Sequence, residues 1–447
     1  MKFSKLLLWT FFWIIIGGTI MLYALSKFTI PNNTPIRWGL LVIGYVFFGV
    51  MGTGVSTYNS LYELFNRKDP KKNPLESIKL RAEWLAFAVL VPGWIMVFAS
   101  VYKPLTMMYI YLSFNDTSRI AWNGLLYVLV GLGIILEIIV LITEKKNNLD
   151  KGIINKVLKF LLSFSTYIAG YAVLVELLLD ANLGGVFGYL STWVLDFGPA
   201  ISILMAILSF YGGIALLTVM NLIYDWSRNK LILSPSISPA KLAKLSSIPG
   251  SNKSSVVNSN KEDEKPFYQN FARDGMFSVI GVGFIMLWWT WLMGTNQEDW
   301  PWTYLLFFGN YWYVFWLFVV ILGLIIPLGS YVLAYKNNGN KKWLLIASVT
   351  SLIGMFSMIF LADILPQSIS WYYSNSPVSP FNSVWTYEFR STYITSHQWT
   401  FLPFSLDPWN LWWFIGGTLF ALGFFTLGIL LLPLEENEKP KHAWIFK

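Results

Sequence analysis

Long apolar runs alternate with short polar, lysine-rich segments along the 447 residues of this chain. Runs of about 18 or more apolar residues are long enough to cross a bilayer as helices. The sequence holds ten of them, at 7–26, 38–64, 83–102, 120–143, 157–179, 199–224, 276–294, 309–335, 343–362 and 409–432. The first run lacks a clear small-residue cleavage site, so we interpret it as a retained span rather than a signal peptide. The pattern predicts an all-α integral membrane protein with about ten transmembrane helices.

Composition agrees with a membrane protein and excludes several kinds of site. Hydrophobic residues make up 55% of the chain and charged residues only 13%. Cysteine is absent, which excludes disulfides, thiolate metal sites and cysteine-ligated iron–sulfur clusters. The two histidines, His397 and His442, fall outside the predicted spans, so a bis-histidine haem is excluded. We therefore expect no metal or haem in this chain.

Basic residues give the predicted spans an orientation. If the N-terminus is cytoplasmic, all but five of the 32 basic residues fall in cytoplasmic segments. The exceptions are Lys27, Arg37, Lys103, Arg119 and Arg390. This bias is the positive-inside pattern. It predicts a multi-pass protein of the cell membrane with both termini cytoplasmic, and it explains the net charge of +8 without a nucleic-acid partner.

Two long polar segments divide the chain. Residues 225–274 are rich in Ser, Asn, Lys and Pro, which predicts a flexible cytoplasmic linker. Residues 363–408 form an outer loop rich in aromatic residues, which lies either on the membrane interface or under a partner protein. The predicted parts are 1–37, an N-terminal helix and outer loop; 38–224 and 275–362, the membrane core; and 409–447, a last helix and cytoplasmic tail.

Few ionisable residues fall within the spans, where each costs about 2.5–3.5 kcal/mol on insertion scales. Glu83 begins the third span, Glu137 lies in the inner half of the fourth, and Glu176 and Asp180 lie one turn apart in the fifth. Such groups suit a proton relay or interhelical hydrogen bonds, and both interpretations stay open. The acids at span ends, Glu63, Asp225 and Asp363, are expected to be solvated.

Polar and aromatic residues gather where the second to fourth spans meet the outer face. They are Arg37, Trp38, Lys103, Asn115, Arg119 and Trp122. A quinone headgroup needs hydrogen bonds for two carbonyls, aromatic walls and access from lipid. On chemistry alone, the ordinary interfacial belt of Trp, Tyr and Arg is the favoured explanation.

The segment GYVFFGVMGTGVSTY, from Gly44 to Tyr58, holds four glycines inside an apolar span. No strand precedes them and no Lys-Ser/Thr pair follows, which excludes a nucleotide-binding loop. Small residues at 49, 52, 53 and 56 can line one side of a helix. They predict close packing against a neighbouring helix.

Several stretches, in this order, resemble the NrfD/PsrC family, the quinone-binding membrane subunits of polysulfide- and sulfur-reductase-type molybdenum enzymes. YVFFGVMGTG (45–54) resembles the glycine-rich first core helix of that family. RAEWLAFAVLVPGWIMVFASVYKP (81–104) and FNDTSRIAWNG (114–124) resemble its next helix, turn and third-helix entry. YIAGYAVLVELL (167–178) and YWYVFWLFVVILGLIIPL (311–328) resemble two later helices. The resemblance implies an eight-helix core of two four-helix bundles, with one flanking helix at each end.

The resemblance also implies a function. The chain would be a non-catalytic or quinol-oxidising subunit of a multi-subunit oxidoreductase. It would bind a quinone, menaquinone-type or other, and exchange electrons with an iron–sulfur subunit on the outer face, which serves a molybdopterin catalytic subunit. The implied quinone-binding residues are Arg37, Trp38, Tyr45, Lys103, Asn115, Arg119, Trp122 and Tyr171, and the implied proton-transfer residues are Glu83, Glu137, Glu176 and Asp180.

The chain departs from the family pattern at three places. RWGLLVIGY (37–45) has no histidine, Ser100 to Tyr102 stand where the family has an acid, and IFLADILPQ (359–367) lacks a common arginine. Two alternatives stay open. One is the same fold serving a hydrogenase or a dimethyl sulfoxide or tetrathionate reductase. The other is a proton-coupled secondary transporter that uses Glu137 and Glu176, although no inverted repeat is visible.

Overall fold

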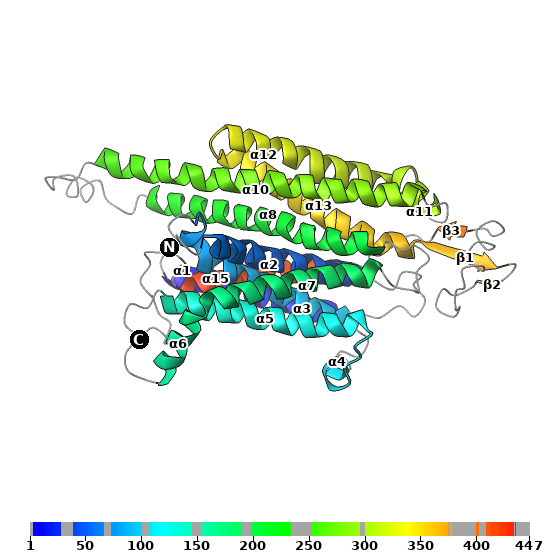
Figure 1. Ribbon diagram of the computed structural model, residues 1–447, viewed down its shortest axis with the longest axis horizontal. Coiled ribbons are helices and arrows are strands. Elements are labelled where there is room, and N and C mark those ends of the chain that lie inside the picture. The colour runs from blue at the N-terminus through cyan, green and yellow to red at the C-terminus, as the bar shows by residue number, and fades with distance from the viewer. Residues whose placement is uncertain are drawn as a thin grey trace.

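The computed structural model describes residues 3–27, 39–66, 73–100, 108–144, 153–188, 198–233, 253–295, 300–373, 376–377, 399–401, 408–432 and 434. Long helices run side by side along one axis (Figure 1). Among the described residues, ten helical spans are long and apolar enough to cross a membrane. The prediction of an all-α integral membrane protein with ten spans is therefore confirmed.

The first four-helix bundle contains the helix that links the two bundles, α2. It consists of α2 (Leu40–Phe65), α3 (Lys79–Ser100), α5 (Arg119–Glu144) and α7 (Ser165–Gly188). Helix α2 packs against α3 and α7 within this bundle and against α8 of the second bundle. Nearly all of α2 is buried, so its polar side chains meet protein rather than lipid.

The second bundle lies beside the first and contains a continuous but irregular helix. Its members are α8 (Gly198–Leu233), α10 (Lys253–Thr295), η5 (Val314–Ile325) continuing into α12 (Ile326–Lys336), and α13 (Lys341–Gln367). The segment η5 is π-helical and is followed by Pro327. Proline cannot donate to the carbonyl four residues earlier, at Gly323. The Tyr211 hydroxyl donates to that carbonyl at 2.5 Å, which ties α8 to this helix.

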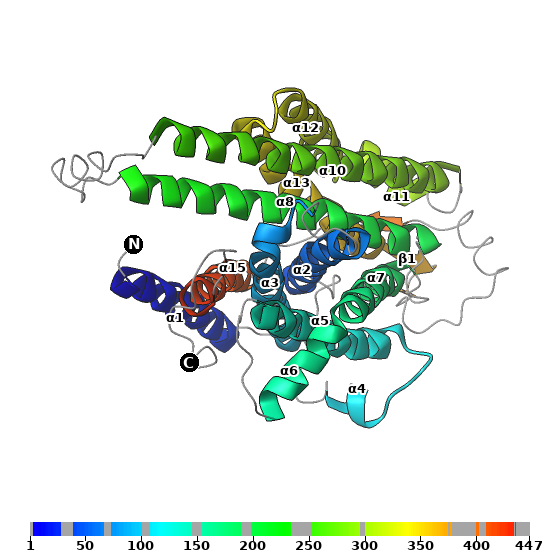
Figure 2. The same ribbon diagram turned by 60° about the vertical axis from the view of Figure 1, so that its left-hand side comes forward.

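The first and last spans flank the core as a pair. Helices α1 (Phe3–Lys27) and α15 (Pro408–Leu431) pack together, and α15 also packs on α3 (Figure 2). The Thr10 hydroxyl donates to the Thr426 hydroxyl at 3.0 Å. Backbones approach closely at Gly17, where an added Cβ would clash with Gly416 and Phe420. This arrangement confirms the expected flanking helices.

Shorter elements lie at the ends of the spans. They are η2 (Glu76–Ile78), α4 (Tyr109–Leu112), α6 (Ile153–Ser163) and α11 (Trp300–Phe307). Strands β1 (Ile369–Tyr373), β2 (Ser376–Pro377) and β3 (Trp399–Phe401) form an antiparallel sheet in the order β2-β1-β3. They lie beyond the end of α13, at the end of the bundle that the charge pattern predicts to face outside (Figure 1). We call it the predicted outer end.

Helices also enter the segment predicted to be a linker. Helix α8 continues to Leu233 and α10 begins at Lys253, within the predicted linker 225–274. Residues 234–252 lie outside the described residues, as does much of the predicted aromatic loop.

Glycines bring the two bundles into backbone contact. A Cβ added at Gly54 of α2 would clash with the carbonyl of Ser209 on α8, and one added at Gly213 would clash with Gly54. At Gly52, an added Cβ would lie 3.1 Å from the Ala86 carbonyl oxygen of α3. The predicted close approach to a neighbouring backbone is confirmed at Gly52. A closer one occurs at Gly54, outside the predicted set, and joins α2 to the second bundle.

Candidate functional site

Four buried carboxyl groups from three helices converge on α2. They are Glu83 of α3, Glu137 of α5, and Glu176 and Asp180 of α7, all between 0% and 7% exposed. Each accepts a hydrogen bond from a side chain of α2. We call these carboxyl groups and their α2 partners the acidic column.

Two hydrogen bonds of the acidic column connect α2 to α7. Thr53 Oγ1 donates to Asp180 Oδ1 at 2.8 Å, and Thr57 Oγ1 donates to Glu176 Oε2 at 2.7 Å. The two threonines lie four residues apart on α2, and the two acids lie four residues apart on α7. Residues at this spacing share a helix face, so the pairs align along the two helices.

The other hydrogen bonds of the acidic column connect α2 to α3 and α5. Ser56 Oγ lies 2.9 Å from Glu83 Oε2 and 3.5 Å from Glu137 Oε2, so it stands between the two carboxyl groups. Asn59 Nδ2 donates to Glu83 Oε1 at 2.7 Å, and Ser60 Oγ donates to Glu137 Oε1 at 2.7 Å. Carboxyl groups of three helices thus follow one another along the eight residues Thr53–Ser60 of α2, a rise of about 10 Å.

The hydrogen bonding of the column is incomplete. None of its four carboxyl groups forms an ion pair with a described residue. Glu176 Oε1 and Asp180 Oδ2 accept no hydrogen bond from the described residues. Buried polar atoms without a protein partner are normally satisfied by water. The interior beside α2 therefore has the polarity that a chain of waters and exchangeable protons requires.

Polar groups continue from the column toward the predicted outer end. The Tyr127 ring on α5 lies 5.9 Å from the Tyr45 ring, between centroids, and the Tyr127 hydroxyl is close enough to Asp180 to interact electrostatically. The Tyr127 hydroxyl occupies the space that a side chain at Gly49 would fill. Tyr45 in turn lies near Asn123 and Asp363. From Tyr45 to Ser60, α2 rises about 22 Å of a hydrocarbon core about 30 Å thick.

The structure gathers some predicted quinone-binding residues at the entry to α5 and gives them local contacts. Asn115 is exposed, and its side chain accepts hydrogen bonds from the Thr117 amide and hydroxyl at 3.1 and 2.8 Å. Trp122 is 41% exposed, and its indole donates to the Asp116 carbonyl at 2.8 Å. The Arg119 guanidinium lies over Gly185 of α7. These contacts shape the turn before α5.

The remaining predicted quinone-binding residues fall elsewhere. Tyr171 lies in the half of α7 nearer the predicted inner end, where its hydroxyl donates to the Leu129 carbonyl of α5 at 3.1 Å. Arg37, Trp38 and Lys103 lie outside the described residues. Of the predicted set, Tyr45 is thus the residue that the structure brings to the polar groups of the interior.

The sequence interpretation missed two features of this region. Their small size predicts packing roles for Thr53 and Ser56, whereas both donate to carboxyl groups. The available signal was the density of hydroxyl and amide groups in Thr53–Ser60, within an apolar span. Asp363 was expected to be solvated at a span end, and this was wrong. Helix α13 continues to Gln367, so Asp363 lies inside it and is fully buried.

The other two acids at span ends form ion pairs near the surface. Glu63 Oε2 lies 3.5 Å from Lys79 Nζ, and Asp225 Oδ2 lies 3.1 Å from Lys341 Nζ. Both carboxylates are partly exposed. These residues differ from the acidic column, whose carboxyl groups have hydroxyl and amide partners instead of cations.

The fold and the acidic column define a multi-span membrane protein with a polar interior in one of its two bundles. A family model described as polysulphide reductase, NrfD, matches residues 29–240 and 259–369, which is most of the chain. The chain therefore belongs to the NrfD family and is a membrane subunit of a polysulphide-reductase-like oxidoreductase complex. A search of curated proteins found no match.

Proposed function

We propose that this chain exchanges electrons between the membrane quinone pool and an iron–sulfur subunit docked at the predicted outer end. That subunit would serve a molybdopterin catalytic subunit in a respiratory sulfur- or polysulfide-reductase-type complex. The observation that carries the proposal is the acidic column along α2 in a chain of the NrfD family.

The chemistry of a quinol requires both an electron acceptor and proton acceptors. Oxidation of one quinol to quinone breaks two O–H bonds and releases two electrons and two protons. The electrons pass to the iron–sulfur partner by tunnelling, so no redox centre is needed in this chain. The protons pass to carboxyl and hydroxyl groups near the headgroup. Reduction of a quinone runs the same transfers in reverse.

The acidic column supplies groups that can accept and release those protons. Asp180 lies nearest Tyr127 and the predicted outer end, and Glu176 follows one turn further in. Glu83 and Glu137 share Ser56, beside Thr57, and extend further in to Asn59 and Ser60. Serine and threonine hydroxyls both accept and donate hydrogen bonds, so they can relay a proton between carboxyl groups. The column thus carries protons along the axis of the first bundle.

The headgroup binds at the predicted outer end of the same bundle. Tyr45 has a phenol that can donate to a quinone carbonyl, and its ring stands against Tyr127. The surrounding residues proposed to bind or position the quinone are Arg37, Trp38, Lys103, Asn115, Arg119, Trp122 and Tyr171. In this orientation both termini are cytoplasmic and the chain lies in the cytoplasmic membrane.

The test is to purify the complex from its native membrane and measure bound quinone and quinol-linked electron transfer together. We expect quinone in the organic extract and electron transfer from added quinol to the terminal acceptor. A complex with neither would overturn the proposal. Uptake of a solute driven by a proton gradient, in liposomes that contain this chain alone, would support the transporter alternative instead.

A further inference from the structure

Asp363 is a buried acid that the acidic column does not use. It lies on α13 of the second bundle and is fully buried. Neither of its carboxyl oxygens accepts a hydrogen bond from the described residues, and it forms no ion pair with them. It lies near enough to Tyr45 of α2, across the boundary between the two bundles, to interact with that hydroxyl electrostatically. An unpaired buried carboxyl is costly, so a ligand or water is expected beside it.

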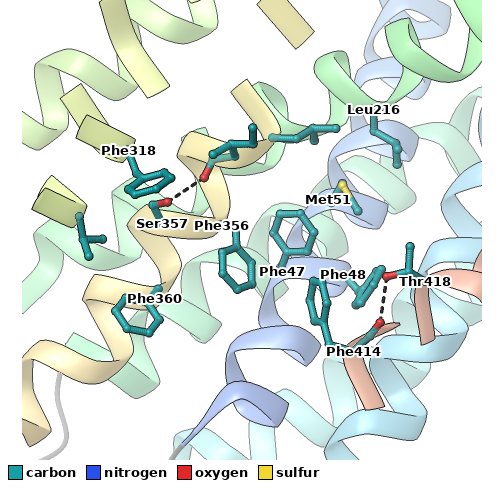
Figure 3. A pocket seen from close by; sticks show the side chains of 13 residues that line it. Phe47, Phe48, Met51, Leu216, Phe318, Phe356, Ser357, Phe360, Phe414 and Thr418 are labelled. Carbon is teal, nitrogen blue, oxygen red and sulfur yellow. Dashed lines mark hydrogen bonds between the residues drawn. The ribbon is translucent and has the colours of Figure 1, made fainter. Parts of the chain in front are cut away.

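A cavity of about 570 Å³ lies at the same boundary. Its walls come from α2, α8, η5, α13 and α15, and Figure 3 shows aromatic rings from α2, α13 and α15 facing into it. Two lining residues have hydroxyls, Ser357 and Thr418. Each donates to a carbonyl of its own helix, of Ile353 and Phe414 respectively, both at 2.9 Å (Figure 3). The cavity wall therefore suits a hydrocarbon chain, and the volume is typical of small-molecule sites.

The cavity leads to the Tyr45–Asp363 pair along two helices. On α13, Phe360 lines the cavity and Asp363 lies three residues further toward the predicted outer end. On α2, Phe48 lines the cavity and Tyr45 lies three residues further toward the same end. Three residues correspond to one turn and a rise of about 4.5 Å, so each pair shares a helix face. Polar groups thus stand at the outer end of an apolar cavity.

The cavity has an opening toward the hydrocarbon. Among its lining residues, Ile353 of α13 is 38% exposed and Thr418 of α15 is also exposed. Exposed apolar side chains adjoin both positions, including Val349 and Leu422. A chain could therefore enter sideways from the bilayer, between α13 and α15.

We propose that this boundary is a quinone site, in which Tyr45 and Asp363 bind the headgroup and the cavity holds the first isoprenoid units of the tail. The proposal rests on the proposed function and adds a second-bundle residue to it. The head of the site favours a quinone over a phospholipid. A phosphate needs a cation, whereas Asp363 interacts with no described basic side chain. A neutral quinone carbonyl needs only a hydrogen-bond donor, which a carboxylic acid or a phenol provides.

The first experiment separates tail from headgroup. Membranes containing the whole complex are assayed with two quinols of the same headgroup, one with a long isoprenoid tail and one with none. Ile353→Trp narrows the opening of the cavity. We expect it to lower kcat/KM for the long-tailed quinol about tenfold and to leave the tailless quinol within about twofold. The matched control is Val349→Trp, one turn away on α13 and exposed to lipid, which should change neither value.

The second experiment tests the headgroup contact. Asp363→Leu removes the carboxyl and should lower kcat/KM for both quinols about tenfold. Asp363→Asn restores a donor and should recover activity to within about threefold of wild type. Removing an unpaired buried carboxyl does not destabilise a helix bundle. The unfolding temperature of Asp363→Leu should therefore be at least as high as that of wild type. If Asp363 had only a structural role, Asp363→Leu would lower the unfolding temperature and Asp363→Asn would not recover activity.

The outcomes distinguish failure of the proposed quinone site from failure of the proposed function. If wild type oxidises both quinols but Ile353→Trp affects both equally or neither, the tail site is wrong. Loss of a co-purified phospholipid from Ile353→Trp, with normal quinol kinetics, would assign the cavity to an acyl chain and also overturn it. If wild type oxidises neither quinol, the proposed function itself fails.

Discussion

The two four-helix bundles bury polar side chains in different ways. In the first, hydroxyls of α2 donate across helix boundaries to carboxyl groups of α3, α5 and α7. In the second, Thr218, Ser278 and Ser357 donate to carbonyls of their own helix, at 2.7 to 2.9 Å. A buried hydroxyl that bonds its own helix completes a structure that already exists. One that holds a carboxyl group of another helix adds a group that can exchange protons.

The acids divide in the same way. In the second bundle, Asp225 and Asp274 lie toward the predicted inner end and pair with Lys341 and Arg273. In the first, the acidic column has no described cation. The Asp225–Lys341 pair joins α8 to α13, whereas unpaired acids in the interior are functional candidates. Asp363 is the exception of the second bundle, and it faces the first.

The largest effect is expected at the contact that joins the bundles. Gly54→Leu places a side chain against the Ser209 carbonyl of α8, where backbone cannot move aside. We expect no monodisperse protein by size-exclusion chromatography. At Gly170 of α7 an added Cβ meets nothing within 4 Å, so Gly170→Leu should elute like wild type. Equal elution of the two variants would show that close packing at Gly54 is dispensable.

The next effect should separate the acids of the two bundles. Glu176→Gln keeps the size of the side chain and an acceptor for Thr57 but cannot carry a proton. We expect quinol-linked electron transfer to fall roughly tenfold or more, as for loss of a general acid or base. Asp225→Asn, at the ion pair with Lys341, should stay within about twofold of wild type. Equal activity of the two variants would remove the acidic column from the mechanism.

Much of this architecture could be predicted from the sequence, because its causes are local. Apolar run length predicted ten spans, and the glycines of Gly44–Gly54 predicted close helix contacts. The candidate acids were visible because charged residues are rare in spans. What they bind was not visible, because hydrogen-bond partners such as Thr57 and Glu176 lie 119 residues apart. That pairing depends on how α2 and α7 pack.

The ends of helices were the second feature that the sequence did not predict correctly. The spans were predicted from hydropathy, which falls near Asp363 because the acid itself is polar. The helix does not end there, since Leu365 and Gln367 continue to pack, and Asp363 stays inside the protein. A polar residue near the end of an apolar run thus lowers the hydropathy that defines the end. The cavity beside it could not be predicted, because residues of five helical segments form its walls.

A third prediction concerns a paired acid of the second bundle. Asp274 Oδ2 accepts a hydrogen bond from the Tyr58 hydroxyl at 2.8 Å and another from Tyr62, which ties α10 to α2. Asp274→Asn leaves these donors with a weaker acceptor and leaves Arg273 without its ion pair. We expect a loss of about 1–3 kcal/mol in the free energy of unfolding. Denaturation in detergent measures this loss, and quinol-linked activity should stay within about twofold of wild type. Lost activity with unchanged stability would place Asp274 among the proton-transfer residues.

The smallest effect compares two threonines of the same shape and different partners. Thr57→Val removes the hydroxyl that donates to Glu176, whereas Thr218→Val removes a buried one that donates to the Ile214 carbonyl of its own helix, α8. Each loses one hydrogen bond, worth about 1 kcal/mol, so the two variants should unfold at similar temperatures. They should differ in electron transfer from quinol. Without Thr57, Glu176 loses both a positioning contact and a group that can relay its proton. We expect electron transfer from quinol to fall about threefold to fivefold, which is less than the fall expected when the carboxyl group itself is replaced. Thr218→Val should keep full activity. If the two variants are equally active, the hydroxyls of α2 hold the carboxyl groups in place but do not pass protons between them.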